Sequence, residues 1–362
     1  MRIMTAMRTL SIAVASAMAA TLALPARAAG FADVLDTKAT MSPLASRSLL
    51  QAVTRAGDRL VAVGPRGHIV VSADGGATWK QSPVPVSSDL TAVHFADAKQ
   101  GWAVGHDGVV LHTADGGDTW QLQLDGRRAN VLLVEAMERK AAAAPASEDA
   151  QRLLAEGRRY VEQGPDKPFL DVWFADADNG YVVGAYNLIF RTADGGKHWE
   201  SWFDRTDNPK FFNLYAIRPA GEGLYVAGEG GLVLKLDAAG QRFNALAVSY
   251  TGSFFGVAAA QNAVLVFGLR GNVFRSEDDG ATWVKADAGL QATIVAATRA
   301  ASGATLLADV GGRVTATADG GRTFHPITLK QPLPLTGLTA AGEGRLAVTG
   351  PRGVTVTETA TR

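Results

Sequence analysis

The stretch TADGGDTW, residues 113–120, decides the fold because it recurs along the chain. Close copies are SADGGATW (72–79), TADGGKHW (192–199), SEDDGATW (276–283) and TADGGRTF (317–324). The aspartates Asp74 and Asp115 are 41 residues apart, and so are Asp278 and Asp319. A period of about 40 residues indicates a repeat architecture, in which each copy of the motif belongs to one structural unit.

Each copy of the motif stands inside a unit of four short apolar runs. In the second unit these runs are LTAVHFAD, GWAVG, VVLHT and TWQLQL, and the motif separates the last two. Such short runs with alternating apolar positions are typical of strands. A weaker copy, LDAAGQRF (236–243), has Ala238 in the aspartate slot and Phe243 in the tryptophan slot. Four strands in about 40 residues indicate one blade of a β-propeller.

The number of units follows from the turn between the second and third runs, which occurs once in each unit. It aligns seven times, as GPRG (64–67), GHDG (105–108), GAYN (184–187), GEGG (228–231), GLRG (268–271), DVGG (309–312) and GPRG (350–353). We therefore predict an all-β fold, a seven-bladed β-propeller with four-stranded blades. The last unit ends before its fourth strand, and FADVLDTKA (31–39) has strand character. The N-terminal strand is expected to close the ring by completing the last blade, which would remove exposed sheet edges.

Extra residues around 126–166 interrupt the repeat between blades 2 and 3, and they predict a helical hairpin. The helix-forming stretches 130–144 and 147–164 are separated by Pro145. In the second stretch, apolar residues at helical spacing are Ala150, Leu153, Leu154, Gly157 and Val161. Its basic face carries Arg152, Arg158 and Arg159. The hairpin is expected to be either a lid packed on its own propeller or a docking arm for a partner helix or the membrane surface.

The first 28 residues predict a secretory signal peptide. Arg2 and Arg8 form a basic start, an apolar run follows, and ARA (26–28) supplies the small residues of a cleavage site after Ala28. No later run reaches the roughly 20 apolar residues of a membrane helix. We expect residues 29–362 to form an exported, periplasmic, monomeric propeller.

Composition excludes several classes of site and partner. The chain has 35 basic and 35 acidic residues, and removal of the signal peptide takes away three arginines and no acid, leaving a net charge of −3. No nucleic-acid partner is expected, because such a partner requires a net basic surface. The chain has no cysteine, and its six histidines show no metal spacing. We expect no metal and no cofactor.

The repeated motif has the composition of a structural turn. Its glycines permit left-handed backbone, its aspartate can accept bonds from the N–H groups of its own turn, and its aromatic residue can wedge against a neighbouring sheet. The pattern resembles the Asp-box, or BNR repeat. The expected structural residues are Asp74 and Trp79, Asp115 and Trp120, Asp194 and Trp199, Asp278 and Trp283, and Asp319 and Phe324.

The phrase LDVWFADADNGYVVG (170–184), followed by FRTADGGKHW (190–199), resembles the photosystem II stability/assembly factor-like propellers. The resemblance covers nearly the whole chain after the signal peptide. It implies an exported, seven-bladed, non-catalytic scaffold that helps to assemble a membrane-protein complex. It also implies a membrane protein or complex subunit as the partner, with peripheral membrane association.

The turns between the second and third strands lie on the face opposite the Asp-boxes, and variable loops on a rigid frame commonly carry function. Their third residues are Arg66, Asp107, Tyr186, Gly230, Arg270, Gly311 and Arg352. We expect Arg66, Arg270 and Arg352 to form an arginine arc, with Arg66 and Arg352 on adjacent blades, that docks acidic groups of a partner. Tyr186 and the hairpin arginines Arg152, Arg158 and Arg159 are the other candidate contacts. The competing explanation is that turn tips are polar simply because they are solvated.

The alternative function is a carbohydrate-binding propeller or a sialidase-like glycosidase, because Asp-box propellers also carry those activities. Hydrolysis by paired carboxylates requires two of them on either side of the scissile bond. The sequence offers no such pair, and the phosphate-loop and GxSxG motifs are absent. We therefore expect no catalytic residues and no enzyme activity.

Overall fold

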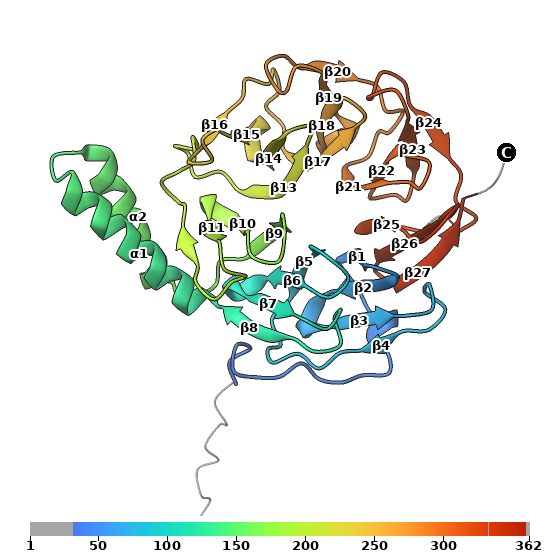
Figure 1. Cartoon of the computed structure of the whole chain (residues 1–362), viewed down its shortest axis with the longest axis horizontal. Helices are drawn as coiled ribbons and strands as arrows, with labels where there is room; N and C mark the ends of the chain where they lie inside the picture. The colour runs from blue at the N-terminus through green and yellow to red at the C-terminus, as the bar shows by residue number, and fades with distance from the viewer. Residues whose placement is uncertain (1–31, 332, 360–362) are drawn as a thin grey trace, which may run out of the picture. The chain divides into compact units, whose positions relative to one another are not determined.

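The computed structural model describes residues 32–331 and 333–359, and the described residues from Asp33 onward form one compact unit. The predicted signal peptide lies outside the described residues. Seven antiparallel sheets make up the unit, and their inner strands pack in sequence around a ring (Figure 1). The last inner strand, β25 (Gly337–Ala340), contacts the first, β1 (Ala52–Ala56), so the ring is closed. The seven-bladed propeller is thereby confirmed.

Each blade runs outward from its inner strand in chain order. Blade 1 contains β1, β2 (Arg59–Val63), β3 (Ile69–Ser72) and β4 (Lys80–Gln81); blade 2 contains β5 (Leu90–Phe95), β6 (Gly101–Gly105), β7 (Val110–Thr113) and β8 (Gln121–Leu124). Blade 3 contains β9 (Phe169–Phe174), β10 (Gly180–Gly184), β11 (Ile189–Thr192) and β12 (Glu200–Ser201); blade 4 contains β13 (Leu214–Ala220), β14 (Gly223–Gly228), β15 (Val233–Leu236) and β16 (Phe243–Ala245). Blade 5 contains β17 (Phe254–Ala260), β18 (Ala263–Gly268), β19 (Val273–Ser276) and β20 (Val284–Ala286); blade 6 contains β21 (Ile294–Arg299), β22 (Thr305–Asp309), β23 (Val314–Thr317) and β24 (His325–Ile327). Blade 7 contains β25, β26 (Arg345–Gly350) and β27 (Gly353–Glu358).

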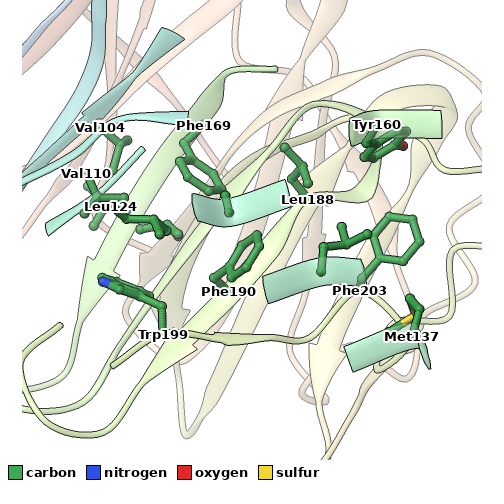
Figure 2. Close-up of a cluster of buried hydrophobic side chains, with 14 of the residues drawn as sticks. Val104, Val110, Leu124, Met137, Tyr160, Phe169, Leu188, Phe190, Trp199 and Phe203 are labelled. Atoms are coloured by element: carbon green, nitrogen blue, oxygen red, sulfur yellow. The ribbon is translucent and has the colours of Figure 1, made fainter. Parts of the chain in front are cut away.

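The core lies between neighbouring blades. The second strands are buried on both faces; every residue of β6 and β10 is buried, which explains why GWAVG and GYVVG contain no charge. Figure 2 shows the largest cluster, where Val104 and Val110 of blade 2 meet Phe169 and Phe190 of blade 3. Burial of large apolar and aromatic side chains on this scale is the main stabilising contribution in a chain without disulfides.

The ring closes differently from the prediction, because no N-terminal strand joins blade 7 among the described residues. Residues 33–39 instead lie along the connection between blades 1 and 2, where Ala39 N donates to Val84 O (3.1 Å). The side chain of Asp33 accepts from Leu35 N (2.9 Å) and starts a turn. Leu35 and Ala39 are both buried in the cluster between blades 1 and 2, and turns and bends take the place of a strand in this segment.

Residues 42–50 make the closure instead. Leu50 N donates to Gly350 O (3.2 Å), and Thr336 Oγ1 donates to Leu50 O (2.7 Å). The outer edge of β27 is bridged near its end by Leu329 pairing with Thr359. Blades 1 to 6 therefore have four strands each, whereas blade 7 has three within the described residues.

The predicted hairpin is present as α1 (Gly126–Ala143) and α2 (Glu148–Gln163), beside blades 2 and 3 (Figure 1). Asp125 caps α1 by accepting from Arg128 N, and Ser147 caps α2 by accepting from Ala150 N. The apolar stripe differs from the prediction at one position, because Val161 is 48% exposed while Tyr160 is fully buried. The larger aromatic side chain, Tyr160, packs edge-on against Phe203, which follows the outer strand of blade 3.

Candidate partner-binding face

The polar side chains of the Asp-box turns form hydrogen bonds within their own turns. In blade 2, Asp115 Oδ1 accepts from Thr113 Oγ1 (2.7 Å) and Thr119 N (2.9 Å), while Oδ2 accepts from Thr119 Oγ1 (2.6 Å). Trp120 Nε1 donates to Gly117 O (3.0 Å), and its ring packs edge-on against Phe95. Both carboxylate oxygens are therefore engaged within the same eight residues.

The same bonds recur around the ring. In blade 1, the hydroxyl and backbone N–H of Thr78 donate to Asp74 and hold the pKa of that carboxyl at about 2. In blade 3, His198 replaces the threonine, and its Nδ1 lies 2.6 Å from Asp194 Oδ2. In blade 4, Asp237 accepts from Gln241 N (2.8 Å), so the weaker copy keeps an aspartate one residue before the expected slot. Within residues 32–331 and 333–359, no group of three or more His, Asp or Glu side chains could hold a metal ion.

The opposite face carries the turns that start the third strand of each blade. In blades 1 to 5 these are the short 3₁₀ turns η2 (Pro65–Gly67), η3 (His106–Gly108), η4 (Ala185–Asn187), η5 (Glu229–Gly231) and η6 (Leu269–Gly271). Their central residues have left-handed backbone, with φ of 60° at Arg66, 53° at Tyr186 and 55° at Arg270. The turns of blades 6 and 7 have a different conformation, because only their fourth residues, Gly312 and Gly353, have positive φ.

Bonds between blades hold these strained backbones. Arg66 N donates to Asp89 Oδ1 (2.8 Å), and Tyr186 N donates to Asn213 Oδ1 (2.8 Å). Each acceptor lies just before the inner strand of the following blade. The backbone of the turn is thus fixed while its central residue stays exposed, and Tyr186 is 52% exposed. Non-glycine residues in left-handed backbone persist only where surrounding structure enforces them.

The three arginines of the predicted arc stand in these turns. Arg66, Arg270 and Arg352 are all exposed, and none of the three forms an ion pair within the described part of the chain. The backbone of Arg47, a residue that the sequence pattern did not identify, lies beside the turn of blade 7. A Cβ placed on Gly353 would lie 2.7 Å from Arg47 Cα, because η1 (Ala45–Arg47) lies across the turn of blade 7. No signal pointed to Arg47, since the expected closing strand occupied a different segment.

The hairpin arginines are not part of this arc. Arg152 pairs with Asp149 (2.8 Å), Arg158 pairs with Glu138 (3.2 Å), and Arg159 pairs with Glu156. All three are exposed, yet each faces an acid of the hairpin itself. Arg152 also lies 4.9 Å from the ring centre of the half-buried Phe211. The basic face predicted for the second helix is therefore largely neutralised.

The axis of the ring contains a hollow of about 350 Å³ lined by the inner strands of all seven blades. Its one carboxylate, Asp171, is buried and bonds Arg218 Nη1 (2.6 Å) and Ile217 N (2.8 Å). Burial lowers the pKa of His94 to about 4, so this imidazole is neutral, with Nε2 donating to Phe174 O (3.0 Å). A single engaged carboxylate does not supply the pair that glycoside hydrolysis uses.

The sequence model of the family described as Photosynthesis system II assembly factor YCF48 matches residues 42–147 and 154–326. This chain belongs to that family. A curated YCF48 relative, the photosystem II assembly lipoprotein Ycf48 of Synechococcus sp. (strain CC9902), is 30% identical over 121 residues. That match covers 32% of this chain and 35% of the relative, so only about a third of the relative's length is matched.

Solved structures of the YCF48 family share the fold. The structure described as "YCF48 bound to D1 peptide" has a TM-score of 0.62 and 15% identity, covering 90% of this chain and 97% of that one. YCF48 from Cyanidioschyzon merolae has a TM-score of 0.57 and 16% identity, covering 89% and 98%. Virginiamycin B lyase from Staphylococcus aureus has a TM-score of 0.63 and 8% identity, covering 90% and 99%. The fold is thus shared by an enzyme and by assembly factors, and it does not determine function.

Proposed function

We propose that this YCF48-family protein is a non-catalytic assembly factor that binds a subunit of a membrane-protein complex through its turn face. Membership of a family described as an assembly factor supports the binding role. One solved relative is described as YCF48 bound to D1 peptide, which supports a peptide segment of a membrane-complex subunit as the ligand.

The observation that carries the proposal is the contrast between fixed backbone and unengaged side chains on the turn face. Cross-blade bonds hold the turns of Arg66 and Tyr186, so these side chains are displayed from a rigid frame. Rigid presentation lowers the entropy lost on binding. Arg47, Arg66 and Arg352 present guanidinium groups, whose planar donors match carboxylates of an acidic partner segment.

The protein acts outside the cytoplasm in this proposal, after cleavage of the signal peptide behind Ala28. The curated relative is named a lipoprotein, which is consistent with export. No helix among the described residues is long and apolar enough to span a membrane. The propeller is proposed to work as a monomer that reaches its client at the membrane surface.

A photo-crosslinker on each face tests the proposal. Val310 is 43% exposed in the turn of blade 6, and Ala77 is exposed in the Asp-box turn of blade 1. With benzoylphenylalanine at either position, the exported protein is irradiated in cells and crosslinked proteins are identified. We expect an integral membrane subunit to be crosslinked from position 310 and not from position 77. Equal crosslinking from both faces, or crosslinks to no membrane protein, would contradict the proposal.

A further inference from the structure

A second hollow, of about 460 Å³, lies where the end of α2 meets the turn of blade 3. Its wall is formed by Arg159, Tyr160, Gln163, Asp166, Lys167 and Tyr186, together with Pro168. The two tyrosines come from different elements but are joined, because Tyr160 Oη donates to Tyr186 O (2.8 Å) and their rings meet edge-on with centres 6.4 Å apart. The hollow therefore has a fixed aromatic wall and borders the turn face at Tyr186.

Lys167 is the unusual group in this wall. Its side chain is only 6% exposed, and lysine is almost never buried without a partner. Its Nζ lies 3.1 Å from Asp166 Oδ1 and 4.6 Å from the centre of the Tyr160 ring. An ammonium has three donors, whereas the described residues supply one acceptor and one aromatic face. The Asp166 side chain is 69% exposed, so water competes for the single carboxylate that faces the lysine.

The backbone at the end of α2 does not take up the remaining donors. The carbonyls of Tyr160 and Gly164 are occupied by Asn130 Nδ2, at 3.1 and 3.0 Å. Arg159, the other cation of the wall, is 54% exposed and pairs with Glu156. A buried ammonium with unused donors, beside a guanidinium and two tyrosine rings, is a setting that recognises an anion carrying an apolar stem.

We propose that this hollow is a subsite for the side-chain carboxylate of an aspartate or glutamate in an extended segment of the client. The inference rests on the proposed function, since it assigns one acidic residue of the client to one place on the turn face. The carboxylate accepts from Lys167, and its methylene stem lies against Tyr186. Asp166 is then an internal competitor, exposed enough to turn outward when the client's carboxylate enters.

The test uses the full mature protein labelled with ¹⁵N-lysine, whose buried ammonium signal reports on Lys167 directly. The probes are two end-blocked peptides, acetyl-Ala-Leu-Glu-Leu-Ala-amide and its Gln counterpart, and a third Gln peptide with a free C-terminus. We expect a saturable shift of the Lys167 signal with the Glu peptide and binding at least about tenfold weaker with the blocked Gln peptide. Asp166→Asn should tighten binding of the Glu peptide, because it removes the internal competitor.

Lys167→Met keeps the apolar stem and should abolish the preference for Glu over Gln. Lys197→Met is the matched control, because Lys197 is exposed on the Asp-box turn of the same blade. Circular dichroism and thermal melting establish that both variants are folded. If Lys167→Met does not fold, the shift of Lys167 in the unaltered chain and the effect of Asp166→Asn still decide the question.

Equal binding of the two blocked peptides overturns the subsite, and it leaves the proposed function standing if crosslinking from position 310 persists. Equal binding of the Glu peptide and the free-terminus Gln peptide overturns the assignment to a side chain in favour of a chain terminus. Selective Glu binding together with unchanged client crosslinking in Lys167→Met overturns the link to the client. Loss of both peptide selectivity and client crosslinking supports the whole inference.

Discussion

The two faces of the propeller repeat the same blade but use their side chains in opposite ways. On the Asp-box face, Asp115 and Thr119 are consumed by bonds within one turn, and Trp120 is buried. On the turn face, hydrogen bonds to the neighbouring blade are made by the backbone N–H of residues such as Arg66, and these residues stay exposed. A repeated residue with satisfied bonds is therefore structural, whereas a varied residue on fixed backbone is available for recognition.

The largest effect on stability is expected from the hairpin inserted between blades 2 and 3. Leu133 of α1 is fully buried in the cluster shared by blades 2 and 3, where a Cβ on Gly157 would lie 2.6 Å from its Cδ2. Leu133→Ala should lower the free energy of unfolding by about 2–5 kcal/mol, since it leaves a cavity in a close-packed contact. Chemical denaturation measures the change, and Val131→Ala, at a position 41% exposed, is the control. A negligible effect of Leu133→Ala would favour a loosely attached docking arm over a packed lid.

A smaller loss of stability is expected from replacing the aspartates of the Asp-box turns. Asp115→Ala removes an acceptor of three hydrogen bonds and should lower the melting temperature by several degrees, whereas Asp237→Ala removes one and should lower it less. Neither change should alter client crosslinking from position 310. Loss of crosslinking with an unchanged melting temperature in Asp115→Ala would show that the Asp-box face takes part in recognition.

Low pH should reduce the stability that the Asp-box turns give to the fold. Hydrogen bonds, first from the threonine hydroxyls of Thr78 and Thr282, lower the pKa values of Asp74 and Asp278 from 3.8 to about 2. Because the folded pKa lies below the unfolded one, the stabilisation is present above about pH 4 and is lost as the pH falls towards 2. Melting temperatures between pH 5 and pH 2 should therefore fall less steeply in the Asp74→Asn, Asp278→Asn double variant than in the unaltered protein. Parallel curves for the two proteins would refute this origin of acid sensitivity.

The sequence was sufficient to predict the blades and the hairpin because both depend on local, repeated patterns. The spacing of the Asp-box motifs predicted the repeated four-stranded units. The helical spacing in 147–164 predicted the buried residues of the second helix, except that Tyr160 is buried in place of Val161. Ring closure was mispredicted because FADVLDTKA contains enough apolar residues for a strand, while its Asp33 turn and the buried pair Leu35 and Ala39 direct it elsewhere. That choice depends on tertiary packing, which overrides a short strand-like pattern.

The candidate site was predictable only in part. The positions of Arg66, Tyr186 and Arg352 follow from the aligned turns, because alignment places equivalent residues on one face. Arg47 and Lys167 do not belong to the repeat. Each reaches the face through a segment whose path is set by packing: η1 across the blade 7 turn, and the end of the hairpin against Tyr160. Residues that reach a site from outside the repeated unit cannot be found from the repeat pattern of the sequence.

The central claim, that recognition belongs to the turn face alone, is tested most directly by matched charge reversal. One variant carries Arg66→Glu and Arg352→Glu, and the other carries Lys80→Glu and Lys197→Glu beside the Asp-box turns, where both lysines are exposed. Client crosslinking from position 310 and the melting temperature are measured for each. We predict that the arginine variant loses crosslinking at an unchanged melting temperature while the lysine variant keeps both. Undiminished crosslinking in the arginine variant, or equal loss in the two variants, would contradict the claim.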